Sequence, residues 1–210
     1  MNICNHQTSL GFTPELYPQG VHMCYLYNDE EERKRVISAY LRSGLEQRES
    51  VGYFPDVLSP DMLEHALNQL GIAALAQGQP NQYQVSTAVQ TYCPDGQFDP
   101  ERLVDRLRDL YRQSIAAGFS GARISGEMSW ALRGIPGSER LIAYESMLNK
   151  MVADEPLTMI CQFDASKFDG ATIFEIINVH PMMIVRGQVI NNPYYVPPDE
   201  YLKNYAHGAR

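Results

Sequence analysis

The sequence has little cysteine, and its cysteines show no paired spacing. The 210 residues contain four, namely Cys4, Cys24, Cys93 and Cys161, without a CxxC pair. Small secreted disulfide scaffolds and zinc ribbons both need closely spaced cysteines. We therefore expect no disulfide framework and a reducing environment.

Long apolar runs and basic segments are missing as well. No stretch approaches the roughly 20 apolar residues of a membrane helix. Residues 1–12 lack the basic and apolar regions of a signal peptide. The net charge of −8 argues against nucleic acid as the main partner, because phosphate binding needs clustered Lys and Arg. These absences predict a cytoplasmic protein whose partners include neither a membrane nor nucleic acid.

The composition, with 44% hydrophobic and 20% charged residues, is that of an ordinary globular protein. Short apolar runs alternate with longer patterns of helical periodicity, which is typical of βαβ units and a mostly parallel sheet. Helix starts are expected at Asn28, where Glu31 has capping-box spacing, and at Ser59, Asp99 and Ser138. The predicted strands are residues 21–27, 51–54, 83–90, 122–126, 157–163 and 182–190, the last a strand or hairpin, with 157–163 at the sheet centre. We predict one domain over residues 1–210, with a core from about 20 to 198 and a tail at each end.

The segment after the first predicted strand has no phosphate-binding loop. Residues 28–32 read Asn-Asp-Glu-Glu-Glu, without the glycines and the lysine that hold a nucleotide phosphate. The four carboxylates would satisfy the positive end of the following helix themselves. This pattern excludes standard phosphate-loop chemistry.

Two groups of residues are candidates for a ligand site. Glu127 and Trp130 follow the 122–126 strand, where ligands of parallel sheets bind, although an exposed glutamate and a packing tryptophan would give the same pattern. His22 and Cys24 share one face of their strand, Cys161 lies in the central strand and His180 follows the last core helix. These four could bind a metal or a haem, or could simply be core residues.

No catalytic residue set is predicted. A GxSxG elbow is absent, and Cys24 and Cys161 lie in apolar strands, where burial raises the pKa of a thiol and makes it unreactive. We therefore expect no enzymatic activity, and the sequence assigns no cofactor.

Several short motifs in the chain occur in the order known from one family. They are His22-Met23-Cys24-Tyr25-Leu26-Tyr27, Gly44-Leu45, Glu49, Gly96-Gln97-Phe98-Asp99-Pro100, Arg123, Gly126-Glu127-Met128-Ser129-Trp130, Tyr144-Glu145, Cys161-Gln162-Phe163-Asp164 and His180-Pro181. With these motifs the chain resembles the methanogen/methylotroph sensory domain family (MEDS), found in regulators of one-carbon and chlorinated-methane metabolism and beside histidine kinases. The resemblance implies a three-layer α/β/α fold of the RecA/KaiC type without ATPase motifs.

The resemblance also implies a function, namely the sensing of small molecules such as hydrocarbon or one-carbon derivatives. The signal would pass to a histidine kinase or transcription regulator, or through a homo-oligomer. The residues expected to line the sensing pocket are His22, Cys24, Glu127, Trp130, Cys161 and His180. Two alternatives remain open: a metal- or haem-binding redox sensor that uses His22, Cys24, Cys161 and His180, and a degenerate nucleotide-binding module.

Overall fold

The computed structural model describes residues 6–57, 59–71 and 81–208, so Cys4 lies outside the described part. A seven-stranded sheet forms its centre, in the order β5-β4-β6-β7-β3-β8-β9. All neighbouring strands are parallel except the final pair, β8 and β9, which form a hairpin. The strands are β3 (His22–Tyr27), β4 (Ser50–Phe54), β5 (Tyr83–Val85), β6 (Ala122–Glu127), β7 (Thr158–Asp164), β8 (Met182–Val185) and β9 (Gln188–Asn191).

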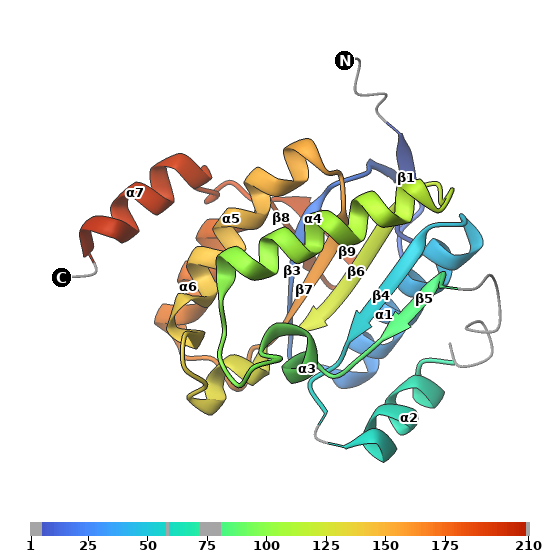
Figure 1. Cartoon of the computed structure of the whole chain (residues 1–210), viewed down its shortest axis with the longest axis horizontal. Helices are drawn as coiled ribbons and strands as arrows, with labels where there is room; N and C mark the ends of the chain where they lie inside the picture. The colour runs from blue at the N-terminus through green and yellow to red at the C-terminus, as the bar shows by residue number, and fades with distance from the viewer. Residues whose placement is uncertain (1–5, 58, 72–80, 209–210) are drawn as a thin grey trace.

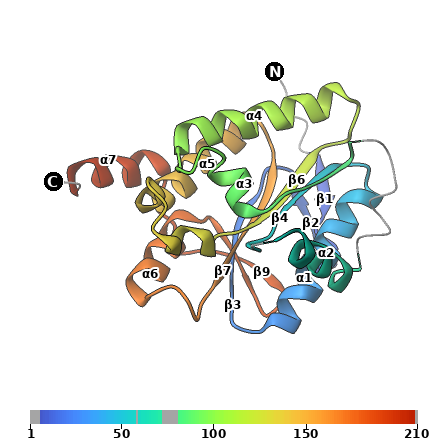
Figure 2. The ribbon, with the colours of Figure 1, turned by 60° about the horizontal axis from the view of Figure 1, so that its bottom comes forward.

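Helices cover both faces of this sheet, giving three layers (Figures 1 and 2). Helices α4, α5 and α6 pack on one face, and α1 packs on the other with α2 beside it. The helices are α1 (Glu30–Glu46), α2 (Pro60–Gln69), α3 (Ala88–Tyr92), α4 (Pro100–Ala116), α5 (Leu141–Asp154), α6 (Gly170–Val179) and α7 (Pro198–Gly208). A small antiparallel pair, β1 (Gln7–Ser9) and β2 (Leu16–Pro18), precedes β3. The expected three-layer fold with a mostly parallel sheet is confirmed.

The alternation of side chains along each strand divides the core into two clusters. Cys24 and Cys161 belong to the cluster under α4 and α5, whereas Met23 and Ile160 belong to the cluster under α1. Strand β7 is the fourth of the seven, as its apolar sequence predicts, because a central strand is buried on both faces. Among the described residues, no helix combines the length and apolar character that a bilayer crossing requires.

Apart from shifts of one residue at strand ends, three element boundaries differ from the prediction. Helix α1 is capped by Asp29, whose carboxylate accepts hydrogen bonds from the amides of Glu31 and Glu32, and not by Asn28. The expected strand 83–90 ends at Val85, because Thr87 caps α3 through a capping box with Gln90. Ser138 begins a 3₁₀ turn, Ser138–Arg140, and α5 follows it.

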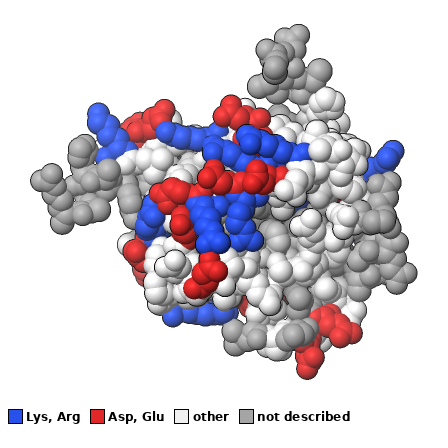
Figure 3. Space-filling model, in the orientation of Figure 1, with Lys and Arg blue, Asp and Glu red and all other residues white. Residues whose placement is uncertain are grey.

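Among the residues that the structure describes, those on the face that carries α4 and α5 form no continuous basic surface. In Figure 3 basic and acidic side chains alternate over it. Ion pairs account for this mixture: Arg112 contacts Glu155, and Arg140 contacts Glu101. Such paired charges do not form the electropositive stripe by which proteins hold nucleic acid.

Candidate functional site

Four buried side chains of the types that can bind a metal converge where α5 packs on the sheet. His22 begins β3, Glu145 lies in α5, Cys161 lies in β7 and His180 follows α6. All four are at most 4% exposed, and one donor atom from each lies within 4.8 Å of those from the others. We call these four residues the buried donor cluster.

The carboxylate of Glu145 is the centre of this cluster. Its Oε2 lies 3.2 Å from His22 Nε2 and 3.4 Å from His180 Nε2, while Cys161 Sγ lies 3.4 Å from His22 Nε2. Burial alone would raise the pKa of Glu145, but the contacts with His180 and His22 outweigh it and lower the pKa to about 2. Burial, together with the neighbouring His180, lowers the pKa of His22.

Cysteine chemistry in this region is suppressed. Burial, followed by the charge of Glu145, raises the pKa of Cys161 well above its usual value and that of Cys24 to about 12. Thiols in this state are poor nucleophiles. Cys24 on β3 lies directly beside Cys161 on the neighbouring strand β7, but it is not one of the four donors of the cluster.

A second polar network lies on the opposite face of the sheet, at the carboxyl ends of β4, β6 and β7. Arg33 Nη1 of α1 donates to Glu127 Oε1 over 2.6 Å and to Gln162 Oε1 over 2.9 Å. Glu127 also accepts from the Tyr53 hydroxyl at 3.2 Å and from the backbone amide of Asp56 at 3.0 Å. These contacts fix the carboxylate where ligands of parallel sheets usually bind.

A cavity of about 430 Å³ opens next to this network, between α1 and α2. Val57, Met62, Ala66 and Leu70 give it apolar walls, and Arg33, Glu127 and His65 are among its polar groups. Its size and its mixture of an apolar wall with a few polar groups are typical of small-molecule sites.

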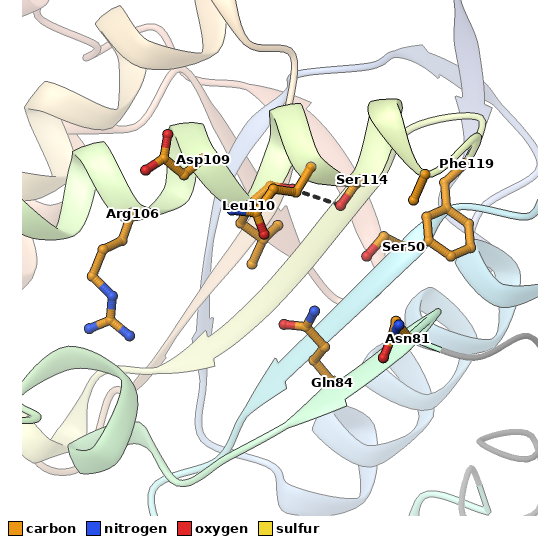
Figure 4. Close-up of a pocket in the computed structure, with 10 residues that line it drawn as sticks. Ser50, Asn81, Gln84, Arg106, Asp109, Leu110, Ser114 and Phe119 are labelled. Carbon is orange, nitrogen blue, oxygen red and sulfur yellow. Dashed lines mark hydrogen bonds between the residues drawn. The ribbon is translucent and has the colours of Figure 1, made fainter.

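Another cavity, of about 440 Å³, lies at the opposite ends of the strands. Figure 4 shows it between α4 and the strands β4 and β5, with Ser50 at the start of β4, Gln84 on β5 and Arg106 and Asp109 on α4. Its position at the amino end of β4 makes it the less favourable candidate.

The six residues predicted to line one pocket thus lie in three places. His22, Cys161 and His180 meet in the buried donor cluster, and Cys24 lies beside them in the same half of the core. Glu127 lines the cavity on the other face. Trp130 is fully buried and stacks on Tyr92 with ring centroids 5.2 Å apart.

Sequence reasoning assigned no site role to Glu145, which appeared only in a family motif, or to Arg33. Glu145 lies in a helix read for its apolar stripe, and Arg33 lies in a highly charged segment typical of a solvated helix face. The position of Glu145 four residues before Asn149 is a helical spacing that could have drawn attention to both.

The start of α1 explains in physical terms how the phosphate site is lost. The Asp29 carboxylate accepts hydrogen bonds from the backbone amides of Glu31 and Glu32, which would otherwise face a phosphate. The Glu30 carboxylate accepts a hydrogen bond from Arg33 Nε at 2.7 Å. A nucleotide would have to displace both carboxylates.

The fold of this chain is similar to that of two solved structures. The flagellar accessory protein FlaH from Methanocaldococcus jannaschii superposes with a TM-score of 0.52 and 13% identity over 82% of this chain and 76% of that one. The KaiC-like protein PH0186 from Pyrococcus horikoshii OT3 gives a TM-score of 0.55 and 12% identity over 80% and 71%. The fold is therefore of the KaiC/RecA type, as the resemblance implied.

Sequence comparison identifies the family. The transcriptional repressor DcmR of Methylorubrum extorquens (strain DSM 6343 / CIP 106787 / DM4) is 22% identical over 160 residues. That match covers 76% of this chain and 57% of the repressor, so the chain spans little more than half of its relative. Residues 21–181 match the family described as MEDS: MEthanogen/methylotroph, DcmR Sensory domain. The chain belongs to this family of sensory domains.

Proposed function

We propose that this chain senses a small organic molecule in the cavity between α1 and α2, and signals without catalysing a reaction. The observation that carries the proposal is the Arg33–Glu127 pair beside an apolar cavity at the carboxyl ends of the strands. Membership of a sensory-domain family and similarity to a transcriptional repressor support the regulatory role.

The cavity indicates the chemical class of the ligand. Its apolar wall of Val57, Met62, Ala66 and Leu70 suits a hydrocarbon body. Arg33 and Glu127 offer a donor and an acceptor to one polar substituent. A hydrocarbon or one-carbon derivative with a single hydroxyl, amine or halogen matches this lining.

Signalling requires that the ligand favour one of two states. Arg33 connects α1 to β6 and β7 through Glu127 and Gln162, so a ligand that competes for Glu127 would loosen α1 from the sheet. We propose that a transcription regulator, a histidine kinase or a second copy of the chain responds to this change at α1.

A ligand screen tests the proposal by thermal shift. Short-chain alcohols, amines and halogenated methanes are the probes, and at about a hundred times its Kd a true ligand should raise the melting temperature by about 5–10 °C. Replacing Ala66 by tryptophan fills the cavity and should abolish the shift. A shift that persists in Ala66→Trp contradicts the proposed site, and a panel without any shift contradicts the proposed ligand class.

The matched control is Ala117→Trp, which places the same bulky side chain in the cavity at the amino end of β4. This variant should respond to the ligand as the unchanged protein does. Loss of the response in Ala117→Trp alone would move the site to the other cavity. Circular dichroism without ligand shows whether each variant is folded.

A further inference from the structure

The donor cluster joins four separate elements of the fold at one buried point. Strand β3 supplies His22, α5 supplies Glu145, β7 supplies Cys161 and the residue after α6 is His180. Two imidazoles, a carboxylate and a thiol are the ligand types that zinc prefers in proteins.

Hydrogen bonds outside the cluster fix which ring nitrogen of each histidine faces inward. The Asn149 amide nitrogen donates to the carbonyls of Glu145 at 3.2 Å and Val179 at 2.8 Å, so its oxygen faces His22 Nδ1 at 3.0 Å. His22 Nδ1 must therefore carry the proton. His180 Nδ1 lies 2.7 Å from the carbonyl oxygen of Ile176 and must likewise donate to it.

With both imidazoles in the neutral form, these tautomers direct two Nε2 lone pairs at the cluster. Both point toward Glu145 Oε2, which is itself an acceptor. In this neutral state the hydrogen that remains among the four groups is that of the Cys161 thiol, which can reach His22 Nε2 at 3.4 Å. One thiol proton cannot satisfy three acceptors, and His180 Nε2 and Glu145 Oε1 have no hydrogen-bond partner among the described residues.

We propose that His22, Glu145, Cys161 and His180 form a four-coordinate site for a divalent transition metal of the zinc class. Zinc bonds of about 2.0–2.3 Å at tetrahedral angles place ligand atoms roughly 3.3–3.7 Å apart. Three of the six separations between cluster atoms, 3.2, 3.4 and 3.4 Å, match these edges closely. All six lie within 4.8 Å, so a bound metal would draw the more distant atoms together.

The surroundings have the features of a structural metal site. Each histidine is held by a hydrogen bond from its second ring nitrogen, the usual outer shell of a metal ligand. Four protein ligands in a buried site leave no open position for substrate. As the metal–sulfur bond forms, the Cys161 proton passes to solvent, so metal binding should release one proton.

A haem does not fit this arrangement. The donor atoms of the four side chains lie within 4.8 Å of one another. They would surround the metal on all sides, so no plane around it is left for the porphyrin ring. The sequence suggested Cys24 as the fourth metal ligand, whereas in the structure the fourth donor is Glu145. The site is independent of the proposed ligand cavity, which lies on the other face of the sheet.

The test is refolding of the full chain from denaturant in Co²⁺ or Zn²⁺ alone, so that burial does not limit metal entry. The expected result is one metal ion per chain and, with Co²⁺, a thiolate charge-transfer band. Refolding without a metal or with a chelator should lower the melting temperature. Failure to retain stoichiometric metal after refolding overturns the proposal.

Three variants locate the site. Cys161→Ser should remove the charge-transfer band, whereas the matched control Cys93→Ser, another buried thiol, should keep it. Asn149→Ala retains all four ligands and should weaken metal affinity by about 10- to 100-fold. A band that survives in Cys161→Ser, or an unchanged affinity in Asn149→Ala, would contradict this assignment.

Discussion

Replacing Arg123 by methionine is expected to lower the free energy of unfolding by about 3–5 kcal/mol. Arg123 is fully buried, and its guanidinium contacts the carboxylate of Glu49, itself 1% exposed. It also donates to the Tyr40 carbonyl at 2.8 Å and to the Thr8 hydroxyl at 2.7 Å. Methionine fills much of the same space but leaves Glu49 as an unpaired charge in the core, which is the source of the loss.

Urea unfolding followed by circular dichroism measures this loss. Arg102→Met is the matched control, because Arg102 pairs with Asp95 on the surface, where both side chains are more than half exposed. Exposed pairs contribute about 0–1 kcal/mol, so this variant should unfold nearly as the unchanged protein does. Equal losses in the two variants would refute the role given to the buried pair.

A double variant separates the effect of the Arg123–Glu49 ion pair from that of the other hydrogen bonds of Arg123. Arg123→Met combined with Glu49→Leu removes both charges, and we expect it to recover most of the stability lost in Arg123→Met. Continued instability of the double variant would show that the hydrogen bonds to Tyr40 and Thr8, and not the charge of Glu49, dominate.

Replacing Trp130 by alanine should also lower the free energy of unfolding by about 3–5 kcal/mol. Its ring is fully buried between Tyr92 and Phe98, at centroid distances of 5.2 and 4.9 Å. The alanine variant loses the aromatic contacts and leaves a void that these two rings cannot fill.

Phenylalanine at position 130 is the informative comparison. Trp130 Nε1 has no hydrogen-bond partner in the described residues, so Trp130→Phe removes no such bond and should cost less than about 1.5 kcal/mol. Both variants should retain the thermal response to the ligand, because Trp130 is not among the residues that line the α1–α2 cavity. Loss of that response in the folded phenylalanine variant would instead make Trp130 part of the ligand site.

The sequence was most informative where a single local rule decides the structure. Apolar runs located the central strand β7, and Ser59 and Asp99 both cap helices as predicted. The cap of α1 was wrong by one residue because Asn28 and Asp29 are both good caps, and only the backbone conformation separates them. Residues 83–90 were misread because a short edge strand and the helix after it share one β-prone segment.

The candidate site was harder to predict because its parts are distant in sequence. Strand alternation placed His22 and Cys24 on one face, but only the packing of α5 on β3 and β7 brings Glu145 to His22 and Cys161. Likewise, nothing local indicates that Arg33 turns inward, since its partner Glu127 is 94 residues away. The periodicity of a sequence shows which face of a helix or strand is buried. It does not show which other helix or strand packs against that face, and the site depends on this packing.

The contacts of Arg123 have a consequence for how such domains are exchanged between proteins in evolution. Two of its acceptors, the Thr8 hydroxyl and the Ser9 carbonyl, lie before the family segment 21–181, as does the fully buried Leu10. Beyond the other end, Asn192 donates to the carbonyls of Ile177 and His180. A gene fusion that joined this sensor to a new output module at the limits of the family segment would open the core on both sides, so a transferable unit must carry these flanks with it.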